Sequence, residues 1–234
     1  MHSNNVTLFL YIFNTQALIS RMRKTSLPYD LGSSGDGISG TATITGKIKI
    51  FQTISQIIGP KSYEFIDIGA GDGVMVSLAM CFGAKYSVGM EVKRDQETVF
   101  KKTFLPLIQL YGGVDCAKHV SIEYDRDLVE YSSLPTLQCS TECEPRVAFA
   151  FCDGFSEDDR RYLFESLIRT DSLLRVFICS GGKGKGERYR HSESILKLLN
   201  GFSVDRQGWS LHSVIKVNMV GSYHRKILFV FALL

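Results

Sequence analysis

The stretch Tyr63–Val92, YEFIDIGAGDGVMVSLAMCFGAKYSVGMEV, decides how this chain is expected to fold. Its first part, residues 65–68, is apolar and partly β-branched, which is typical of a buried parallel strand. The strand runs into residues 69–73, where three glycines allow a tight turn that a ligand can approach closely. An apolar helix over 74–82 and a second strand over 87–92 follow, so the stretch predicts a strand–turn–helix–strand unit.

Two acids in this unit indicate an adenosine-containing ligand with a cationic end. Glu91 closes the second strand, about twenty residues after the glycines, where a carboxylate can bind the two hydroxyls of a ribose. The glycines form G-x-G-x-G instead of the G-x-G-x-x-G of dinucleotide-binding domains, and Asp67 at the strand tip would repel a pyrophosphate. A carboxylate there suits the ammonium group of a methionine moiety.

This pattern resembles motif I of class I S-adenosylmethionine-dependent methyltransferases and the acid that follows it. The resemblance implies S-adenosylmethionine as the cofactor. A nicotinamide or flavin domain and a purely structural glycine turn remain the alternatives. The candidate cofactor-binding residues in this interpretation are Asp67, Gly69, Gly71, Asp72, Gly73, Glu91 and Asp125.

The rest of the chain continues to alternate strands and helices. The apolar spacing predicts, in chain order, a helix over 46–58, a helix over 95–111 that Pro106 kinks or breaks, strands at 119–124 and 146–151, a helix over 157–168 capped by Ser156, a strand at 174–179, a helix over 194–199 and a hairpin of 213–219 with 226–231. The expected fold is therefore α/β: a doubly wound, mostly parallel sheet with a C-terminal antiparallel hairpin, the Rossmann-like class I methyltransferase architecture.

Ligands of such sheets bind outside the carboxyl ends of the strands. Asp125, after the third strand, could accept from an adenine amino group; Asp127 competes for that role, and a solvated turn is the alternative for both. Asp153 and Phe155, after the fourth strand, are the candidate catalytic residues: Asp153, or the carbonyl of Cys152, would orient the acceptor, and Phe155 would wall its channel. Capping of the next helix is the alternative role for Asp153.

Four segments together resemble a narrower family, the non-SET histone-lysine methyltransferases of the telomeric-silencing disruptor type. They are GTATITGKIKIFQTISQII (40–58), FIDIGAGDG (65–73), GMEV (89–92) and FAFCDGF (149–155). The resemblance implies methylation of a histone lysine in nucleosomes, a nuclear location with the cytoplasm as alternative, and a contact between Thr45 and the donor carboxylate. The family has an asparagine-rich N-N-F turn where this chain has CDGF. A nucleic-acid or small-molecule methyltransferase of the same fold is the alternative.

Composition adds little to this choice. The net charge of +3 permits an acidic partner without requiring one. Six cysteines without a C-x-x-C pair indicate a reducing compartment, and no metal site is expected. The basic loop 181–191 could contact nucleic acid, a solvated loop being the alternative. Its cationic residues are Lys183, Lys185, Arg188 and Arg190.

Residues 1–40 are expected to form an N-terminal extension that ends in a flexible linker or lid (26–40), ahead of a methyltransferase domain over 41–234. Within the extension, Val6–Phe13 is apolar but too short to span a bilayer, and no positive charge precedes it. A packed helix or strand is preferred over a signal or anchor, and no stable membrane association is expected.

Overall fold

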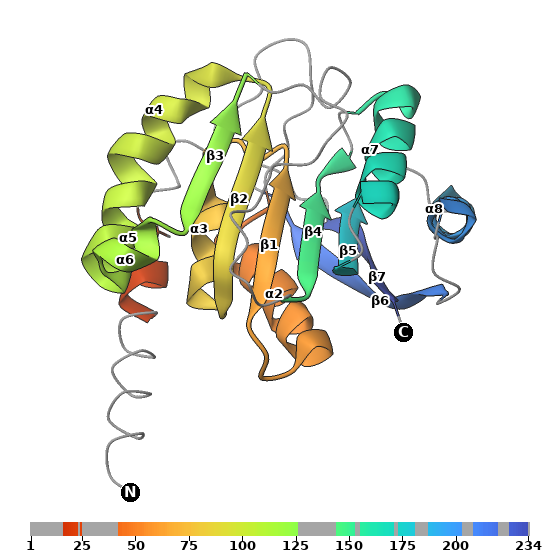
Figure 1. The fold of residues 1–234 in the computed structure, drawn as a ribbon, viewed down its shortest axis with the longest axis horizontal. Coiled ribbons are helices and arrows are strands. Elements are labelled where there is room, and N and C mark those ends of the chain that lie inside the picture. The colour runs from red at the N-terminus through yellow and green to blue at the C-terminus, as the bar shows by residue number, and fades with distance from the viewer. Residues whose placement is uncertain are drawn as a thin grey trace, which may run out of the picture.

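A seven-stranded sheet of order β3-β2-β1-β4-β5-β7-β6 forms the centre of the computed structural model (Figure 1). The structure describes residues 16–22, 24, 42–125, 144–152, 155–170, 173–180, 187–202, 208–219 and 225–233. The strands are β1 Tyr63–Ile68, β2 Ala84–Glu91, β3 Val120–Tyr124, β4 Arg146–Ala150, β5 Leu174–Ser180, β6 Trp209–Asn218 and β7 Arg225–Leu233. Strands β1 to β5 run parallel, and β7 is antiparallel to both β5 and β6. The predicted mostly parallel sheet with a C-terminal hairpin is confirmed.

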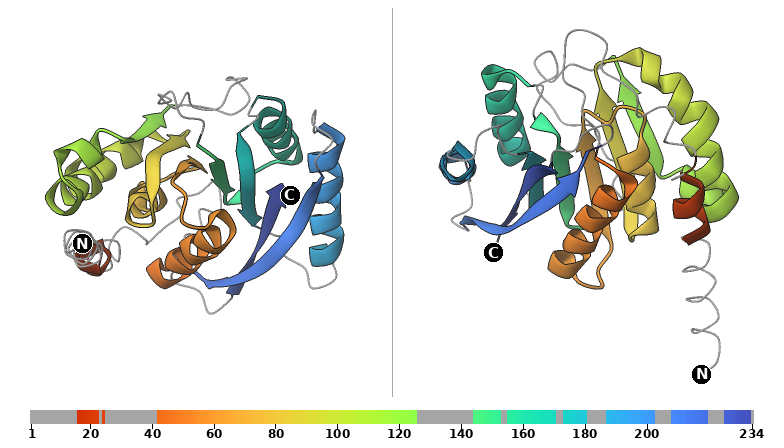
Figure 2. Two further views of the ribbon diagram at one scale, coloured as in Figure 1. Left: turned by 60° about the horizontal axis from the view of Figure 1, so that its bottom comes forward. Right: turned by 180° about the vertical axis from the view of Figure 1, so that it is seen from behind.

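Helices cover both faces of the sheet (Figure 2). They are α2 Ile44–Ile58, α3 Val74–Cys81, the 3₁₀ turn η1 Arg94–Gln96, α4 Glu97–Val99, the π-helical turn η2 Phe100–Phe104, α5 Leu105–Gly112, α6 Val114–Ala117, α7 Glu157–Thr170 and α8 Glu187–Phe202. Side chains alternate along β1, so Phe65 packs in the core with α2 and α3, while Ile66 and Ile68 pack in the core with α7 and α8. Asp67 therefore faces the side of α2 and α3.

Helix α2 begins at the same edge of the sheet as the glycine turn. Thr43 caps the helix, because its side chain accepts a hydrogen bond from the Gly46 amide at 3.1 Å. The Thr43 amide in turn donates to the carbonyl of Asn218, the last residue of β6, at 2.9 Å. Strand β7 is antiparallel to both β5 and β6, so β6 runs in the same direction as β5. Because β5 is parallel to β4 and β4 to β1, β6 also runs in the direction of β1. The first turn of α2 thus lies at the carboxyl edge of the parallel strands.

Several predicted boundaries hold and others change; β2 begins at Ala84 and β6 at Trp209, earlier than the expected 87 and 213. Ser156 and Asp159 exchange hydrogen bonds at 3.1 and 2.9 Å ahead of α7, so the predicted N-cap is confirmed as a capping box. The expected helix over 95–111 is interrupted by η2, just before Pro106, whose missing N–H cannot bond to the carbonyl four residues back. The loop expected over 181–191 was wrong in its second half, because α8 starts at Glu187.

Candidate functional site

The glycine turn after β1 is tied to the end of β2. The amides of Gly69 and Ala70 both donate to the Met90 carbonyl, at 2.9 and 3.0 Å. The Gly71 amide donates to Glu91 Oε2 at 2.8 Å, and Glu91 Oε1 accepts from the Lys93 amide at 3.0 Å. One carboxylate therefore fixes the turn and the start of the next loop together.

Gly71 and Gly73 meet different surroundings within this turn. Both have positive φ angles, 53° and 83°, which residues other than glycine rarely adopt. A Cβ on Gly73 would lie 2.5 Å from Phe100 Cδ2 and 2.6 Å from Ile122 Cδ1, so this glycine allows the core to close. A Cβ on Gly71 would have no atom of the described residues within 4 Å, so among these residues the backbone there borders open space that a ligand can approach.

Asp67 is a buried acid with an incomplete set of partners. Its side chain is only 2% exposed, and Oδ1 accepts no hydrogen bond from the part of the chain that is described. Burial raises the pKa of Asp67 from 3.8 to about 8; Lys47 opposes this shift, whereas Glu91 and Asp72 add to it. A cationic ligand group would supply the missing partner and favour the ionised carboxylate.

Lys47, in the first turns of α2, is a site residue that the sequence reasoning missed. It is only 4% exposed and faces the apolar side of the helix, three residues after Ile44 and four before Phe51. A lysine that interrupts an apolar helical stripe was the signal in the sequence. Thr45, the predicted contact for the donor carboxylate, lies in the same turn and is exposed.

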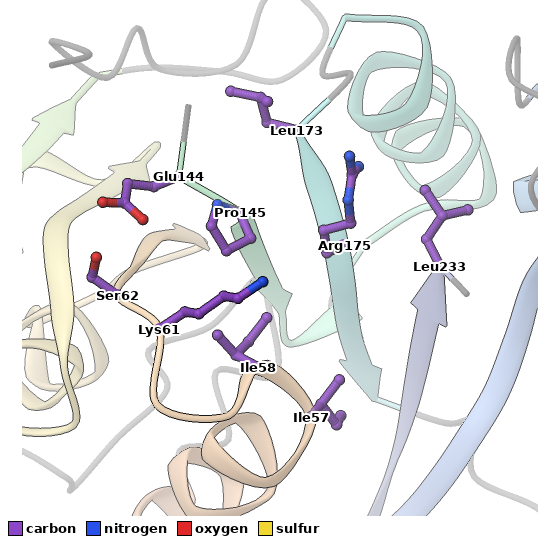
Figure 3. Close-up of a pocket in the computed structure, with 9 residues that line it drawn as sticks. All are labelled: Ile57, Ile58, Lys61, Ser62, Glu144, Pro145, Leu173, Arg175 and Leu233. Atoms are coloured by element: carbon purple, nitrogen blue, oxygen red, sulfur yellow. The ribbon is translucent and has the colours of Figure 1, made fainter. Parts of the chain in front are cut away.

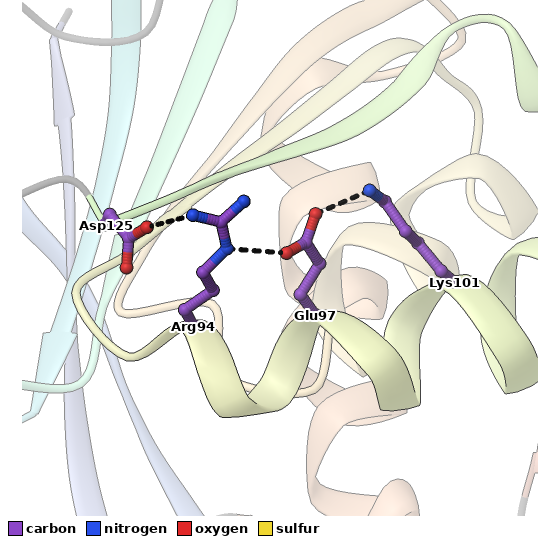
Figure 4. A network of polar contacts seen from close by, with 4 residues as sticks. All are labelled: Arg94, Glu97, Lys101 and Asp125. Carbon is purple, nitrogen blue, oxygen red and sulfur yellow. Dashed lines mark hydrogen bonds and ion pairs between the residues drawn. The ribbon is translucent and has the colours of Figure 1, made fainter.

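A chain of charges runs along the helical segment that follows β2 and reaches Asp125, the residue after β3 (Figure 4). Arg94 donates to Asp125 at 2.9 Å and to Glu97 at 3.1 Å, and Glu97 also pairs with Lys101. These contacts raise the pKa of Arg94 and lower the pKa of Glu97. The Asp125 carboxylate, predicted to face an adenine, is thus held by Arg94 in this structure, and its backbone has a left-handed φ of 58°.

Tyr124, which precedes Asp125, adds an unused hydroxyl to this region. Its oxygen is buried and has no hydrogen-bond partner among the described residues. Burial is the main cause that raises its pKa, and the nearby carboxylates of Asp72 and Glu91 contribute. The hydroxyl therefore stays protonated and can donate.

Of the two candidate catalytic residues, only Phe155 lies within the described ranges. The ring of Phe155 lies over the start of the glycine turn, 3.8 Å from the position of a Cβ on Gly69. The Phe155 carbonyl accepts from Arg160 at 3.0 Å, which ties this segment to α7. Asp153 lies outside the described residues, as do Asp127, Lys183 and Lys185; Arg188 and Arg190 fall on α8.

A cavity of about 570 Å³ lies elsewhere, at the amino edge of the sheet (Figure 3). It is lined by the end of α2, by residues that precede β1 and β4, by the start of β5 and by the end of β7, among them Lys61, Pro145, Arg175 and Leu233. None of the predicted site residues lines it. We place the candidate site at the carboxyl edge instead, because the orphaned carboxyl of Asp67 and the open face of Gly71 both lie there.

The described residues contain neither a cluster of metal ligands nor a helix that could span a membrane. No group of three or more histidine, cysteine or acidic side chains is placed to hold a metal ion. No helix in the described ranges is both long and apolar enough to cross a membrane.

Comparison with known proteins gives structural matches only: no protein-family model and no curated protein sequence matches the chain. A Pyrococcus horikoshii protein described as a proposed RNA methyltransferase matches with TM-score 0.58 at 14% identity, over 94% of this chain and 96% of its own. Magnesium protoporphyrin IX methyltransferase from Synechocystis PCC 6803, with bound SAH, gives 0.55 at 12% identity, over 97% and 99%. Human methyltransferase 10 domain containing protein gives 0.54 at 12% identity, over 93% and 97%. The chain therefore has the mixed α/β, Rossmann-like fold of class I methyltransferases.

Proposed function

We propose that this protein is an S-adenosylmethionine-dependent methyltransferase. The observation that carries the proposal is the buried Asp67 at the tip of β1, whose Oδ1 has no hydrogen-bond partner among the described residues, beside a glycine turn that Glu91 holds. The magnesium protoporphyrin IX methyltransferase of the same fold has been solved with bound SAM and with bound SAH, which supports this choice of cofactor.

The described residues fit such a cofactor. Asp67 would hold its ammonium group, and the open backbone at Gly71 leaves room for close approach. Glu91 would hold the ribose: within the described ranges each of its oxygens makes one hydrogen bond, to Gly71 or Lys93, and a carboxylate oxygen can accept two. Asp72 accepts from the Val74 amide at 3.2 Å, which fixes the start of α3 beside the turn.

When bound, the cofactor would supply a methyl group on a positively charged sulfur, so that a nucleophile can bond to the methyl carbon while the sulfur leaves as a neutral thioether. The protein has to align the nucleophile and exclude water. Phe155 lies over Gly69 and would close one side of the path, while the apolar end of β4 lies next to it. An amine attacks only when neutral, and apolar surroundings lower the pKa of an ammonium group.

We further propose a lysine amine of a histone, in the nucleosome and therefore in the nucleus, as the acceptor. The support is the resemblance of residues 40–58, 65–73, 89–92 and 149–155 to the non-SET histone-lysine methyltransferases. The cationic residues predicted to meet nucleic acid, among them Lys183 and Arg188, agree with a nucleosomal partner.

Two experiments test these proposals separately. Calorimetric titration with S-adenosylmethionine and S-adenosylhomocysteine tests the cofactor: Gly71→Arg should abolish binding, whereas Gly59→Arg, at a glycine of positive φ that ends α2, should not. Incubation with methyl-labelled donor and nucleosomes, free histones, tRNA or DNA tests the acceptor. Label on a histone lysine is expected. Label only on RNA or DNA, or on none of them, would remove the histone proposal and leave the cofactor proposal standing.

A further inference from the structure

We infer that the cavity at the amino edge of the sheet is a second ligand site, which takes a small amphipathic acid: an apolar body with one carboxylate as its head group. The inference does not depend on the proposed function, because the cavity lies at the edge of the sheet opposite to Asp67 and the glycine turn. Its volume of about 570 Å³ is within the range of about 300–1,000 Å³ that small-molecule sites have.

The walls of the cavity are held in place by hydrogen bonds of the backbone. The Glu64 amide, at the start of β1, donates to the Pro145 carbonyl at 3.0 Å. The Arg146 amide, at the start of β4, donates to the Leu173 carbonyl at 2.9 Å. The segments that enter β1, β4 and β5 are therefore fixed relative to one another, and the cavity is formed before a ligand binds.

One side of the cavity is apolar. Ile57 and Ile58, in the last turn of α2, are only partly buried, and so is Leu233 at the end of β7. A ligand with an apolar body would remove this surface from water. The last turn of α2 contains no basic residue, so the negative end of the helix dipole is not neutralised there. An anionic head group is repelled by this helix end, and the apolar body is therefore expected against Ile57 and Ile58.

Two cationic side chains line the other side of the cavity. Lys61 points from the loop before β1 toward β4 and β5, is exposed, and has no ion-pair partner among the described residues (Figure 3). Arg175, on β5, donates to the Leu174 carbonyl at 3.1 Å, and its guanidinium group has further N–H donors. Among the described residues, the one acid that lines the cavity is Glu144, which pairs with Lys85 at 3.4 Å. The cavity thus has a surplus of positive charge, and the head group is expected between Lys61 and Arg175.

The test compares two probes of nearly the same shape that differ in charge. Biphenylcarboxylate and biphenylcarboxamide are titrated into the wild-type protein, Lys61→Glu and the matched control Lys102→Glu, with saturation-transfer NMR as the readout. The wild type should bind the carboxylate roughly fivefold or more tightly than the carboxamide, because two cations face the head group. Lys61→Glu should lose this preference. Lys102, an exposed lysine on η2, gives the same change in net charge, and Lys102→Glu should keep the preference.

Each outcome decides the inference. Equal binding of the two probes by the wild type, or binding of neither, would overturn it, as would an unchanged preference in Lys61→Glu. Melting curves report folding, and Lys61→Gln, with a smaller loss expected, replaces Lys61→Glu if that variant does not fold.

S-adenosylhomocysteine separates this site from the candidate site at the carboxyl edge. A saturating concentration should leave binding of the carboxylate probe unchanged, whereas displacement of the probe would show that it binds at the carboxyl edge and would overturn the inference. A protein that binds the probe with the expected preference but does not bind S-adenosylhomocysteine would refute the proposed function and support the second site.

Discussion

The Glu91 carboxylate accepts a hydrogen bond from the Gly71 amide across twenty residues of sequence, at 2.8 Å. The acid that ends β2 thus has a structural role in the glycine turn even before a ligand binds. The same side chain is only 9% exposed, so its hydrogen bonds to Gly71 and Lys93 are largely shielded from water.

Replacement of Glu91 should therefore affect both stability and donor binding. Glu91→Ala removes two acceptors and leaves the Gly71 and Lys93 amides unpaired, so the free energy of unfolding should fall by about 1–3 kcal/mol. Affinity for S-adenosylhomocysteine should fall by about tenfold or more. Urea denaturation and calorimetry measure the two effects. The control is Asp115→Ala, an exposed acid on α6, and equal affinity in Glu91→Ala and this control would contradict the prediction.

Much of this site could be anticipated from the sequence, because it is built from neighbours in the chain. The glycine spacing and the acid at Glu91 follow from one βαβ unit, in which the turn and the strand end are adjacent by geometry. Lys47 could not be placed in this way. Its relation to Asp67 depends on how α2 packs against the sheet, and the start of α2 is held there by the backbone hydrogen bond from the Thr43 amide to the Asn218 carbonyl, two residues that are far apart in sequence.

The Arg94–Asp125 ion pair is a contact that could not be predicted from the sequence. The strand that leads to Asp125 was predictable from its apolar pattern, but the partner of an exposed carboxylate was not, since several cations compete for it. The N-cap at Ser156, by contrast, could be predicted from the sequence, because Ser156 and its hydrogen-bond partner Asp159 lie within four residues of each other. Helix α8 began earlier than expected, because the run of polar and basic residues before Ser194 carries no helix-breaking residue after Gly186.

The two central glycines of the turn should respond differently to the same substitution. Gly73→Ala should lower the free energy of unfolding by roughly 3 kcal/mol or more, because its Cβ would overlap Phe100 and Ile122 in addition to the strained φ. Gly71→Ala should cost only about 1–2 kcal/mol, the price of the left-handed conformation, since its Cβ enters open space.

Denaturation curves give the ranking, and calorimetry adds a second contrast. Gly71→Ala should fold yet lose donor affinity, because the added methyl group occupies the space that the ligand approaches. Equal loss of stability in the two variants would show that crowding at Gly73 is relieved by movement of Phe100.

Arg94 and Asp125 give a prediction about binding and not about stability. Both side chains are exposed, at 69% and 53%, so Asp125→Asn should leave the melting temperature nearly unchanged. If Asp125 accepts from the adenine, Arg94 competes for its carboxylate. Arg94→Gln should then bind S-adenosylhomocysteine at least as tightly as the wild type, whereas Asp125→Asn should bind it more weakly. Weaker binding by Arg94→Gln than by Asp125→Asn would assign the ligand contact to the arginine.

Asp67 should make both stability and donor binding depend on pH. Its pKa is raised from 3.8 to about 8, so the folded protein holds this proton more tightly than the unfolded chain does. The stabilisation from the proton is complete below about pH 4 and is lost as the pH rises toward 8. Asp67→Asn removes this dependence, and its stability relative to the wild type should therefore increase across that window, by on the order of 6 kcal/mol.

Donor binding should follow the opposite trend with pH, because a ligand ammonium group favours the ionised carboxylate and expels the proton. The affinity of the wild type for S-adenosylhomocysteine should rise between pH 6 and about 8 and then level off. Calorimetry in two buffers of different ionisation enthalpy should detect up to one proton released per ligand bound at pH 7. Lys47→Met should release more protons than the wild type, since Lys47 is the neighbour that lowers the Asp67 pKa. An affinity that stays constant over this range, with no proton released, would contradict the prediction that a protonated Asp67 must ionise to bind the ammonium group.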